Sequence, residues 1–232
     1  MKLGTLALGR YPALVGVMTD FNDRRALRRA LKVGIDAIEI RVDHLDSPDT
    51  TTLTNVIGDI RKRTLPIITT IRSVKEGGKR HIPDGERVAL FEALIPLTDA
   101  VDIELSSKGI LMDVVGIAKG AGKRVIISHH NFRSTPAQSR LEQVVTNGRS
   151  VGGDIVKIAT MVKNDRDVRK LASLTMEHKN LITIAMGEKG AASRIFFPQL
   201  GSLLTYAPIG ETTAPGQLPL KVVRKELARY YV

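Results

Sequence analysis

The feature that most constrains the fold is an alternation of short runs rich in valine and isoleucine with longer segments of helical periodicity. This pattern is typical of βα units, in which helices join parallel strands. We identify eight strand-like runs, spaced by roughly 20 to 30 residues, at residues 13–19, 37–42, 66–72, 100–105, 124–128, 154–159, 181–186 and 202–206.

Helical patterns lie between most of these runs, at residues 23–33, 49–62, 85–95, 111–119, 136–147, 165–177 and 218–230. Asn22 is expected to cap the first helix, and Gly34, Gly120, Gly122 and Gly148 are expected to end helices as left-handed C-caps. Eight strand–helix repeats in 232 residues predict an α/β fold, a compact (β/α)8 TIM barrel, for which about 250 residues is typical.

A doubly wound sheet is the alternative, but it normally uses about five to seven strands. Its glycine-rich turn is also missing, because residues 187–190 match neither G-x-G-x-x-G nor a P-loop. No linker-like tract divides the chain, so residues 1–232 are expected to form one catalytic barrel domain.

The sequence contains no cysteine, which excludes disulfides, thiolate nucleophiles and cysteine-bound metals and suits a reducing cytoplasm. No apolar run approaches the length needed to span a bilayer, and the first residues are too short and too interrupted for a secretory signal. We therefore expect a cytoplasmic protein without a membrane partner.

Lysine and arginine number 35 against 24 acidic residues, and the formal charge of +11 predicts an anionic partner. Nucleic acid is one candidate, but aromatic residues make up only 4% of the chain, tryptophan is absent, and the densest basic stretch, residues 24–29, has the pattern of a solvated helix face. A basic enzyme that attracts a small carboxylate explains the charge equally well, so we expect no nucleic-acid partner.

Polar side chains recur at spacing two near the ends of five consecutive strand-like runs. In a TIM barrel the inward-facing residues at these ends form the active site. Any one of them could instead close the barrel by a salt bridge, for example Glu39 with Arg72. The spacing of His129, His130 and the carboxylates fits no metal site. The polar residues at these ends include Glu39, Arg41, Thr70, Arg72, Asp102, Glu104, Ser128, His130 and Lys157.

Lys157 lies in an apolar run, residues 154–159. Apolar surroundings favour the neutral amine, which can form an imine with a ketone or aldehyde. Lys157 is thus a candidate for Schiff-base chemistry, although a lysine that extends from a strand end to solvent gives the same pattern.

At these residues the sequence resembles the type I 3-dehydroquinate dehydratases of the shikimate pathway, over nearly the whole chain. Each matching segment is weak alone, but six in the right order make a specific signal. The segments are Glu-Ile-Arg-Val-Asp-His (39–44), Thr-Ile-Arg-Ser with Lys-Glu-Gly-Gly (70–78), Ser-His-His-Asn-Phe (128–132), Lys-Ile-Ala-Thr-Met (157–161), Gly-x-x-Gly-x-x-Ser-Arg (187–194) and Ala-Pro-Gly-Gln (214–217).

The resemblance implies dehydration of 3-dehydroquinate to 3-dehydroshikimate, in aromatic amino acid biosynthesis, with no cofactor. It makes Lys157 the lysine that forms an imine with the carbon-3 ketone. His130 becomes the general acid and base, and Glu76 the carboxylate that orients it. His129 is expected to face the opposite way, because adjacent strand residues point apart.

The resemblance also assigns the substrate contacts. Arg194 would bind the substrate carboxylate with Gln217 and Thr213, where the family commonly has serine, and Glu39, Arg41 and Arg72 would hold the ring hydroxyls. Residues 208–217 resemble a lid, though a plain surface loop has the same composition. A homodimer and a stand-alone enzyme are expected. The alternatives are a Schiff-base aldolase, with residues 187–190 as its phosphate site, and a nucleic-acid-binding protein.

Overall fold

The computed structural model describes residues 1–46, 50–62 and 65–231. Its strands are β1 (Lys2–Leu3), β2 (Leu6–Ala7), β3 (Ala13–Met18), β4 (Ala37–Arg41), β5 (Ile67–Thr70), β6 (Ala100–Glu104), β7 (Arg124–Asn131), β8 (Ile155–Met161), β9 (Leu181–Met186) and β10 (Leu204–Ile209). The helices are α1 (Arg24–Val33), α2 (Thr50–Arg61), α3 (Asp84–Leu94), α4 (Leu111–Gly120), α5 (Gln138–Ser150), α6 (Asp165–Glu177), α7 (Ser193–Leu200) and α8 (Leu220–Tyr230). Short 3-10 helices are η1 (Val42–His44), η2 (Val74–Glu76), η3 (Ile95–Leu97) and η4 (Glu188–Gly190).

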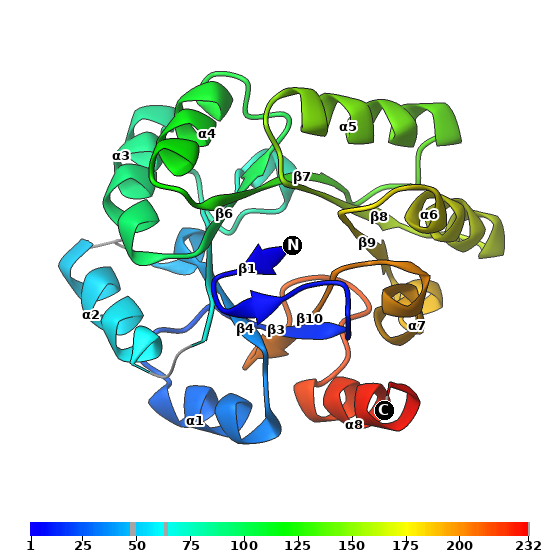
Figure 1. The fold of residues 1–232 in the computed structure, drawn as a ribbon, viewed down its shortest axis with the longest axis horizontal. Coiled ribbons are helices and arrows are strands. Elements are labelled where there is room, and N and C mark those ends of the chain that lie inside the picture. Colours follow the sequence, from blue (N-terminus) through cyan, green and yellow to red (C-terminus); the bar gives the residue numbers. More distant parts are fainter. Residues whose placement is uncertain (47–49, 63–64, 232) are drawn as a thin grey trace.

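Eight parallel strands form one sheet in the order β10-β3-β4-β5-β6-β7-β8-β9. The two outer strands meet at their amino ends, where the N–H of Leu203 donates to the carbonyl of Leu181 at 2.8 Å. The sheet therefore nearly closes into a barrel, and the helices surround it in sequence order (Figure 1). This arrangement confirms the predicted (β/α)8 barrel and its single domain.

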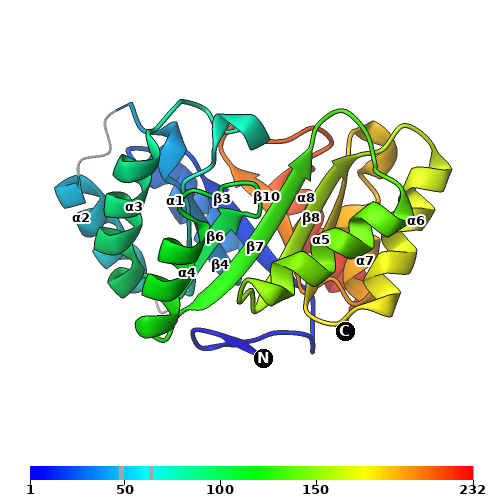
Figure 2. The ribbon, with the colours of Figure 1, turned by 90° about the horizontal axis from the view of Figure 1, so that it is seen from above.

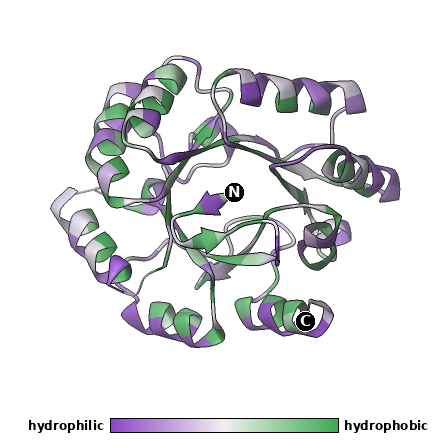
Figure 3. Ribbon diagram, viewed as in Figure 1, coloured by the Kyte–Doolittle hydropathy of each residue, from purple (hydrophilic) through white to green (hydrophobic). Residues whose placement is uncertain are grey.

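The strands are rich in branched side chains, which suit a pleated surface buried on both faces. Neighbouring residues of a strand point to opposite sides, so on β7 Ile126 belongs to the core inside the barrel and Ile127 to the core beneath the helices. The helices turn apolar faces toward the sheet and polar faces outward (Figure 3). The inner core fills the barrel near the amino ends of the strands and leaves the carboxyl ends to polar groups.

An antiparallel hairpin of β1 and β2, which the sequence patterns did not predict, covers the amino ends of the barrel strands (Figure 2). Leu3 and Leu8 are buried there and join the inner core. The hairpin therefore closes the barrel end opposite to the carboxyl ends of the strands.

Several predicted boundaries need correction. The cap of α1 is Asp23, which accepts from the N–H of Ala26 at 2.7 Å, and not Asn22. Strand β7 extends three residues beyond the predicted run 124–128, and β10 is shifted toward the carboxyl end of the run 202–206. Helix α7 was missed. The predicted helix 49–62 is α2, but its first residue, Asp49, lies outside the described residues.

Two of the predicted glycine C-caps are also wrong. Gly34 caps α1 in the left-handed conformation, and Gly122 has a positive φ just after α4. Gly120, by contrast, is the last residue of α4, and Gly148 lies inside α5. A Cβ at Gly148 would come within 2.9 Å of Val156, so this glycine lets α5 pack closely on β8.

Candidate active site

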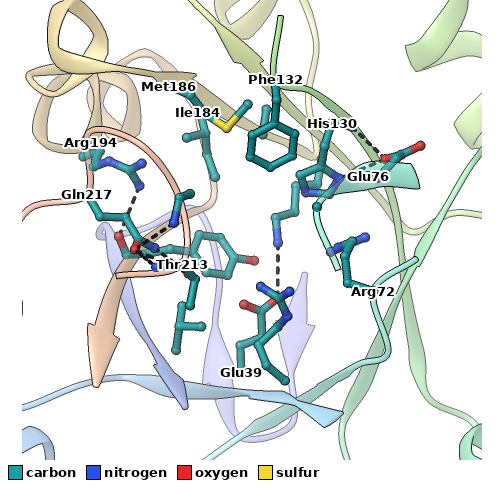
Figure 4. Close-up of a pocket in the computed structure, with 17 residues that line it drawn as sticks. Glu39, Arg72, Glu76, His130, Phe132, Ile184, Met186, Arg194, Thr213 and Gln217 are labelled. Carbon is teal, nitrogen blue, oxygen red and sulfur yellow. Dashed lines mark hydrogen bonds and ion pairs between the residues drawn. The ribbon is translucent and has the colours of Figure 1, made fainter. Parts of the chain in front are cut away.

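The carboxyl ends of the strands surround a cavity of about 500 Å³, including its open mouth (Figure 4). All nine candidate residues line it: the fold brings together side chains on β4, β7 and β8 and on the segments that follow β5, β9 and β10. Phe132, Ile184 and Met186 form an apolar wall of the same cavity. The nine are Glu39, Arg41, Arg72, Glu76, His130, Lys157, Arg194, Thr213 and Gln217.

Lys157 projects from β8 into the barrel and is only 4% exposed. Its Nζ donates to Asp102 Oδ2 at 2.8 Å and to Glu39 Oε1 at 3.2 Å. Its strand neighbours Val156 and Ile158 are apolar, as expected, yet the amine itself lies between two carboxylates. The expectation of apolar surroundings is therefore wrong at Nζ, because β4 and β6 supply charged groups that the sequence around Lys157 does not reveal.

A buried ionic network continues from Asp102 across the barrel. Arg72 donates to Asp102 at 2.8 Å, to Glu104 at 3.0 Å and to Ser128 at 2.6 Å. Although burial opposes the shift, Arg72 and Lys157 hold the pKa of Asp102 far below its usual range. Arg72 thus pairs with Asp102 and Glu104, and the salt bridge between Glu39 and Arg72 that we considered from the sequence is replaced by the contact of Glu39 with Lys157.

His130 and Glu76 form a second unit in the cavity (Figure 4). His130 Nδ1 lies 3.0 Å from Glu76 Oε2, which also accepts from the His130 backbone N–H at 2.8 Å. The other Glu76 oxygen accepts from the Ser106 hydroxyl. Glu76 belongs to η2, directly after β5, which brings it to β7.

The protonation state of His130 follows from this environment. Burial and the positive charge of Arg72 lower the pKa of His130 to about 3, with Lys157 adding to the effect and Glu76 opposing it. The imidazole is therefore neutral at neutral pH. Since Nδ1–H donates to the Glu76 carboxylate, Nε2 keeps its lone pair and can accept a proton.

On the opposite side of the cavity lie Arg194, Thr213 and Gln217 (Figure 4). Arg194 is 4% exposed and donates to the backbone carbonyls of Gly216 at 2.8 Å, Pro215 at 3.3 Å and Tyr206 at 3.4 Å. Burial lowers its pKa to about 10, so it stays charged at neutral pH. Among the described residues no carboxylate pairs with Arg194, which makes it a receptor for an anion.

Thr213 and Gln217 are fixed to each other within residues 208–217. Gln217 Oε1 accepts from the Thr213 N–H at 2.6 Å, and its Nε2 donates to Thr213 Oγ1 at 3.0 Å. Gly216 has a φ of +72°, and a Cβ there would come within 2.3 Å of the Gly187 carbonyl oxygen. This close approach holds the segment against the loop after β9.

Arg41 makes a two-pronged contact with Asp43, through Nε at 2.9 Å and a terminal nitrogen at 2.7 Å. Although burial opposes it, Arg41 together with backbone N–H groups of Lys79 and Arg72 holds the pKa of Asp43 below its usual range. Both side chains are buried at the cavity edge. Arg41 is thus held in place by Asp43, beside the ring-binding candidates Glu39 and Arg72.

Two residues in contact with Lys157 Nζ were missed or left without a role. Asp102 was recognised as a polar strand end, but its contact with Lys157 could not be read from the sequence. Tyr206 on β10 was missed; its ring lies 4.2 Å from Lys157 Nζ, measured to the ring centroid. The usable signal was its place in a strand, two residues from Leu204 on the inward face.

The neighbouring polar groups lie outside the cavity. His129 faces a groove between α4 and α5 with Leu105 and Arg140, as expected for the residue next to His130. In the described part of the chain, one group offers three possible metal-ligand atoms within 4.8 Å of one another: Glu142 on α5, Glu177 at the end of α6 and His178 directly after it. It does not line the cavity around Lys157.

Among the helices of the described ranges, none has both the length and the apolarity to cross a membrane. Residues 14–231 match the family model for type I 3-dehydroquinase. A 3-dehydroquinate dehydratase of Thermodesulfovibrio yellowstonii is 39% identical over 224 residues, which cover 93% of this chain and 94% of that protein.

Two solved structures show the same fold. The 3-dehydroquinate dehydratase of Aquifex aeolicus superposes with a TM-score of 0.87 at 35% identity, over 94% of this chain and 99% of that one. The type I enzyme of Clostridium difficile, described as holding covalently modified comenic acid, gives 0.88 at 27% identity, over 99% and 96%. The chain therefore belongs to the type I 3-dehydroquinase family, whose members are hydro-lyases that dehydrate 3-dehydroquinate.

Proposed function

We propose that residues 1–232 form one catalytic barrel that converts 3-dehydroquinate to 3-dehydroshikimate through an imine on Lys157. The observation that carries this proposal is a buried lysine amine and a neutral, carboxylate-bound histidine in one cavity. The same cavity contains Arg194, which has no carboxylate partner among the described residues. The covalently modified comenic acid described for the Clostridium difficile relative supports covalent chemistry in this family.

In the first step Lys157 Nζ attacks the carbon-3 ketone and the resulting carbinolamine loses water. The product is a protonated imine, whose positive nitrogen accepts electrons from carbon 2 far better than the neutral ketone does. Glu39 Oε1, 3.2 Å from Nζ, is placed to accept the proton that the ammonium must lose before attack, whereas Asp102, with its strongly lowered pKa, stays ionised beside Nζ. They also balance the positive charge of the imine that follows.

In the second step His130 Nε2 takes a proton from carbon 2, and the electron pair moves into the imine. The same histidine then gives its proton to the carbon-1 hydroxyl, which leaves as water. Through Nδ1, Glu76 fixes the tautomer of the neutral imidazole and stabilises the imidazolium that forms when Nε2 takes the proton. Hydrolysis of the imine consumes one water and returns Lys157, so the net change is the loss of a single water molecule.

Arg194 supplies the site for the substrate carboxylate, because its guanidinium is charged, buried and, within the described residues, hydrogen-bonded only to backbone carbonyls. Gln217 and Thr213 lie beside it, and Thr213 keeps the hydroxyl of the family's serine. Glu39, Arg41 and Arg72 line the same cavity, where they can hold the ring hydroxyls. Residues 208–217 act as the lid that brings Gln217 to the substrate.

We further propose that the enzyme is a cytoplasmic homodimer of the shikimate pathway, and that it requires no cofactor. The cysteine-free sequence supports the reducing compartment, and the family resemblance supports the dimer.

The nearest competing function is that of a sugar-phosphate aldolase, and the turn at residues 187–190 argues against it. The Gly187 N–H donates to the Pro215 carbonyl at 3.2 Å, and the Gly190 N–H donates to the Gly187 carbonyl at 3.0 Å. These amides are not directed at an external phosphate, as a phosphate cradle requires.

The proposal is tested by adding 3-dehydroquinate to the purified protein and to Lys157→Met, and following the ultraviolet absorbance of the conjugated enone. Borohydride is then added, and the mass of each protein is measured. We expect product and a trapped adduct on Lys157 in the wild type and neither in the variant, while the surface control Lys119→Met behaves as wild type. A folded wild type that forms no product contradicts the proposed reaction, and product without a trapped adduct contradicts the imine.

A further inference from the structure

Tyr206 on β10 is the one side chain of the cavity, among the described residues, that has a buried polar atom without a hydrogen-bond partner. The residue is 3% exposed, and its hydroxyl neither donates nor accepts a hydrogen bond within the described chain. A buried hydroxyl left in this way is costly unless a bound molecule completes it. The hydroxyl therefore marks a place where a ligand atom is expected.

The ring of Tyr206 carries a second, independent observation. Lys157 Nζ lies over its face, 4.2 Å from the ring centroid. The face of an aromatic ring is negative and attracts a cation. This attraction applies to the ammonium and equally to a protonated imine, because both place a positive nitrogen at the same position.

The electrostatic setting keeps the phenol neutral. Burial raises the pKa of Tyr206, and the carboxylates of Glu39 and Asp102 raise it further. A neutral phenol can donate one hydrogen bond and accept others, whereas a phenolate could only accept. Since Glu39 and Asp102 are engaged by Lys157, the Tyr206 hydroxyl stays available for an oxygen of the bound molecule.

We infer that Tyr206 is a further substrate-binding and catalytic residue: its hydroxyl hydrogen-bonds an oxygen of the bound ring acid, and its ring face stabilises the positive nitrogen of Lys157 before and after imine formation. The second part rests on the proposed function, since it requires the imine. The inference gives β10 a direct part in the reaction, besides carrying the lid that follows it.

The test compares Tyr206→Phe, which removes only the hydroxyl, with Tyr231→Phe as a matched control. Tyr231 is outside the cavity, and its hydroxyl donates to the Ile195 carbonyl at 2.8 Å. We expect Tyr206→Phe to raise the KM for 3-dehydroquinate about tenfold, which corresponds to one hydrogen bond of about 1.4 kcal/mol, and to raise the melting temperature of the free protein. Tyr231→Phe should leave KM unchanged and lower the melting temperature.

Tyr206→Leu adds a readout for the ring, because it removes the aromatic face as well. We expect a lower rate of borohydride-trappable adduct formation than in Tyr206→Phe, with Lys157 intact in both. An unchanged KM in Tyr206→Phe overturns the role of the hydroxyl, and equal trapping rates in the Phe and Leu variants overturn the role of the ring. A wild type that cannot be trapped at all contradicts the proposed imine instead, so the two failures are distinguishable.

Discussion

Replacing Lys157 by methionine should cost stability as well as activity, because the lysine balances a buried ionic network. Lys157, Arg72 and Arg87 face the carboxylates of Glu39, Asp102 and Glu104, so charges of the two signs are equal in number. The variant leaves one negative charge unbalanced. Asp102 keeps Arg72 and Ser128, whereas Glu39 keeps, among its hydrogen-bond partners in the described residues, only the Thr70 hydroxyl at 2.9 Å.

Breaking a buried pair by removing one partner costs about 3 to 5 kcal/mol, whereas an exposed pair contributes about 0 to 1 kcal/mol. Lys119→Met is the matched control, since Lys119 Nζ lies 2.7 Å from Asp154 Oδ2, much as Lys157 Nζ lies 2.8 Å from Asp102 Oδ2. The two lysines differ in burial: the side chain of Lys119 is 41% exposed and that of Lys157 is 5% exposed. We therefore expect a loss of several kcal/mol for Lys157→Met and less than about 1 kcal/mol for Lys119→Met.

The assay is urea unfolding followed by circular dichroism, with the free energies compared at equal denaturant slopes. The pH dependence provides a second check. A carboxyl whose pKa is lowered in the folded state, as that of Asp102 is, contributes stability above its unfolded value of about 3.9 and loses it as pH falls. The deficit of Lys157→Met should thus be full at neutral pH and shrink below about pH 4. Equal losses in the two variants at neutral pH would refute this account.

Three further changes test the site. His130→Ala should lower kcat by about 10²- to 10⁴-fold while borohydride still traps the imine on Lys157; loss of trapping would contradict a role confined to proton transfer. Because the pKa of His130 is about 3 and its neutral form is the base, wild-type kcat/KM should fall only at acid pH well below 6.5. A fall of kcat/KM near pH 6.5, the pKa of a free histidine, would count against this assignment. Arg194→Gln keeps N–H donors for the loop carbonyls but removes the charge. The loss of a hydrogen bond to a charged group, about 1.5 to 3 kcal/mol, should raise KM by about 10- to 150-fold in steady-state kinetics, and an unchanged KM would refute carboxylate binding there. Gly216→Ala forces a Cβ onto the Gly187 carbonyl at a positive φ. Denaturant unfolding should therefore show a free energy of unfolding lowered by about 1 to 3 kcal/mol, and KM should rise. Wild-type values for both would show that residues 208–217 do not depend on this contact.

The barrel itself could be predicted from the sequence, because its signal is local and repeated. Each strand is a short run of branched apolar residues and each helix has its own period, so eight repeats survive errors of a few residues at their ends. Features with weaker local signals were misjudged. Helix α7 has a proline at Pro198, inside its last turn, and the two-residue strands of the amino-terminal hairpin are too short to show a period.

Strand patterns predicted part of the site, and the family resemblance predicted the rest. Glu39, Arg72 and Lys157 follow from alternation, because the inward positions near the carboxyl ends of barrel strands face the active site, and a polar residue there is exposed to the substrate. Glu76 lies on η2, and Thr213 and Gln217 lie within residues 208–217. No period applies there, and the family resemblance alone identified these residues. Arg194 was identified in the same way, since it lies on a helix that the patterns missed.

The sequence by itself therefore determined the order of strands and helices, the inward face of each strand and the residue types available at the carboxyl ends. The tertiary structure decided which charges meet. Lys157 lies against carboxylates 55 and 118 residues away in the sequence, and His130 is oriented by a carboxylate 54 residues away. Such pairings depend on the angle at which the strands close into the barrel and on the burial that removes water, and both are properties of the assembled sheet and absent from any single segment.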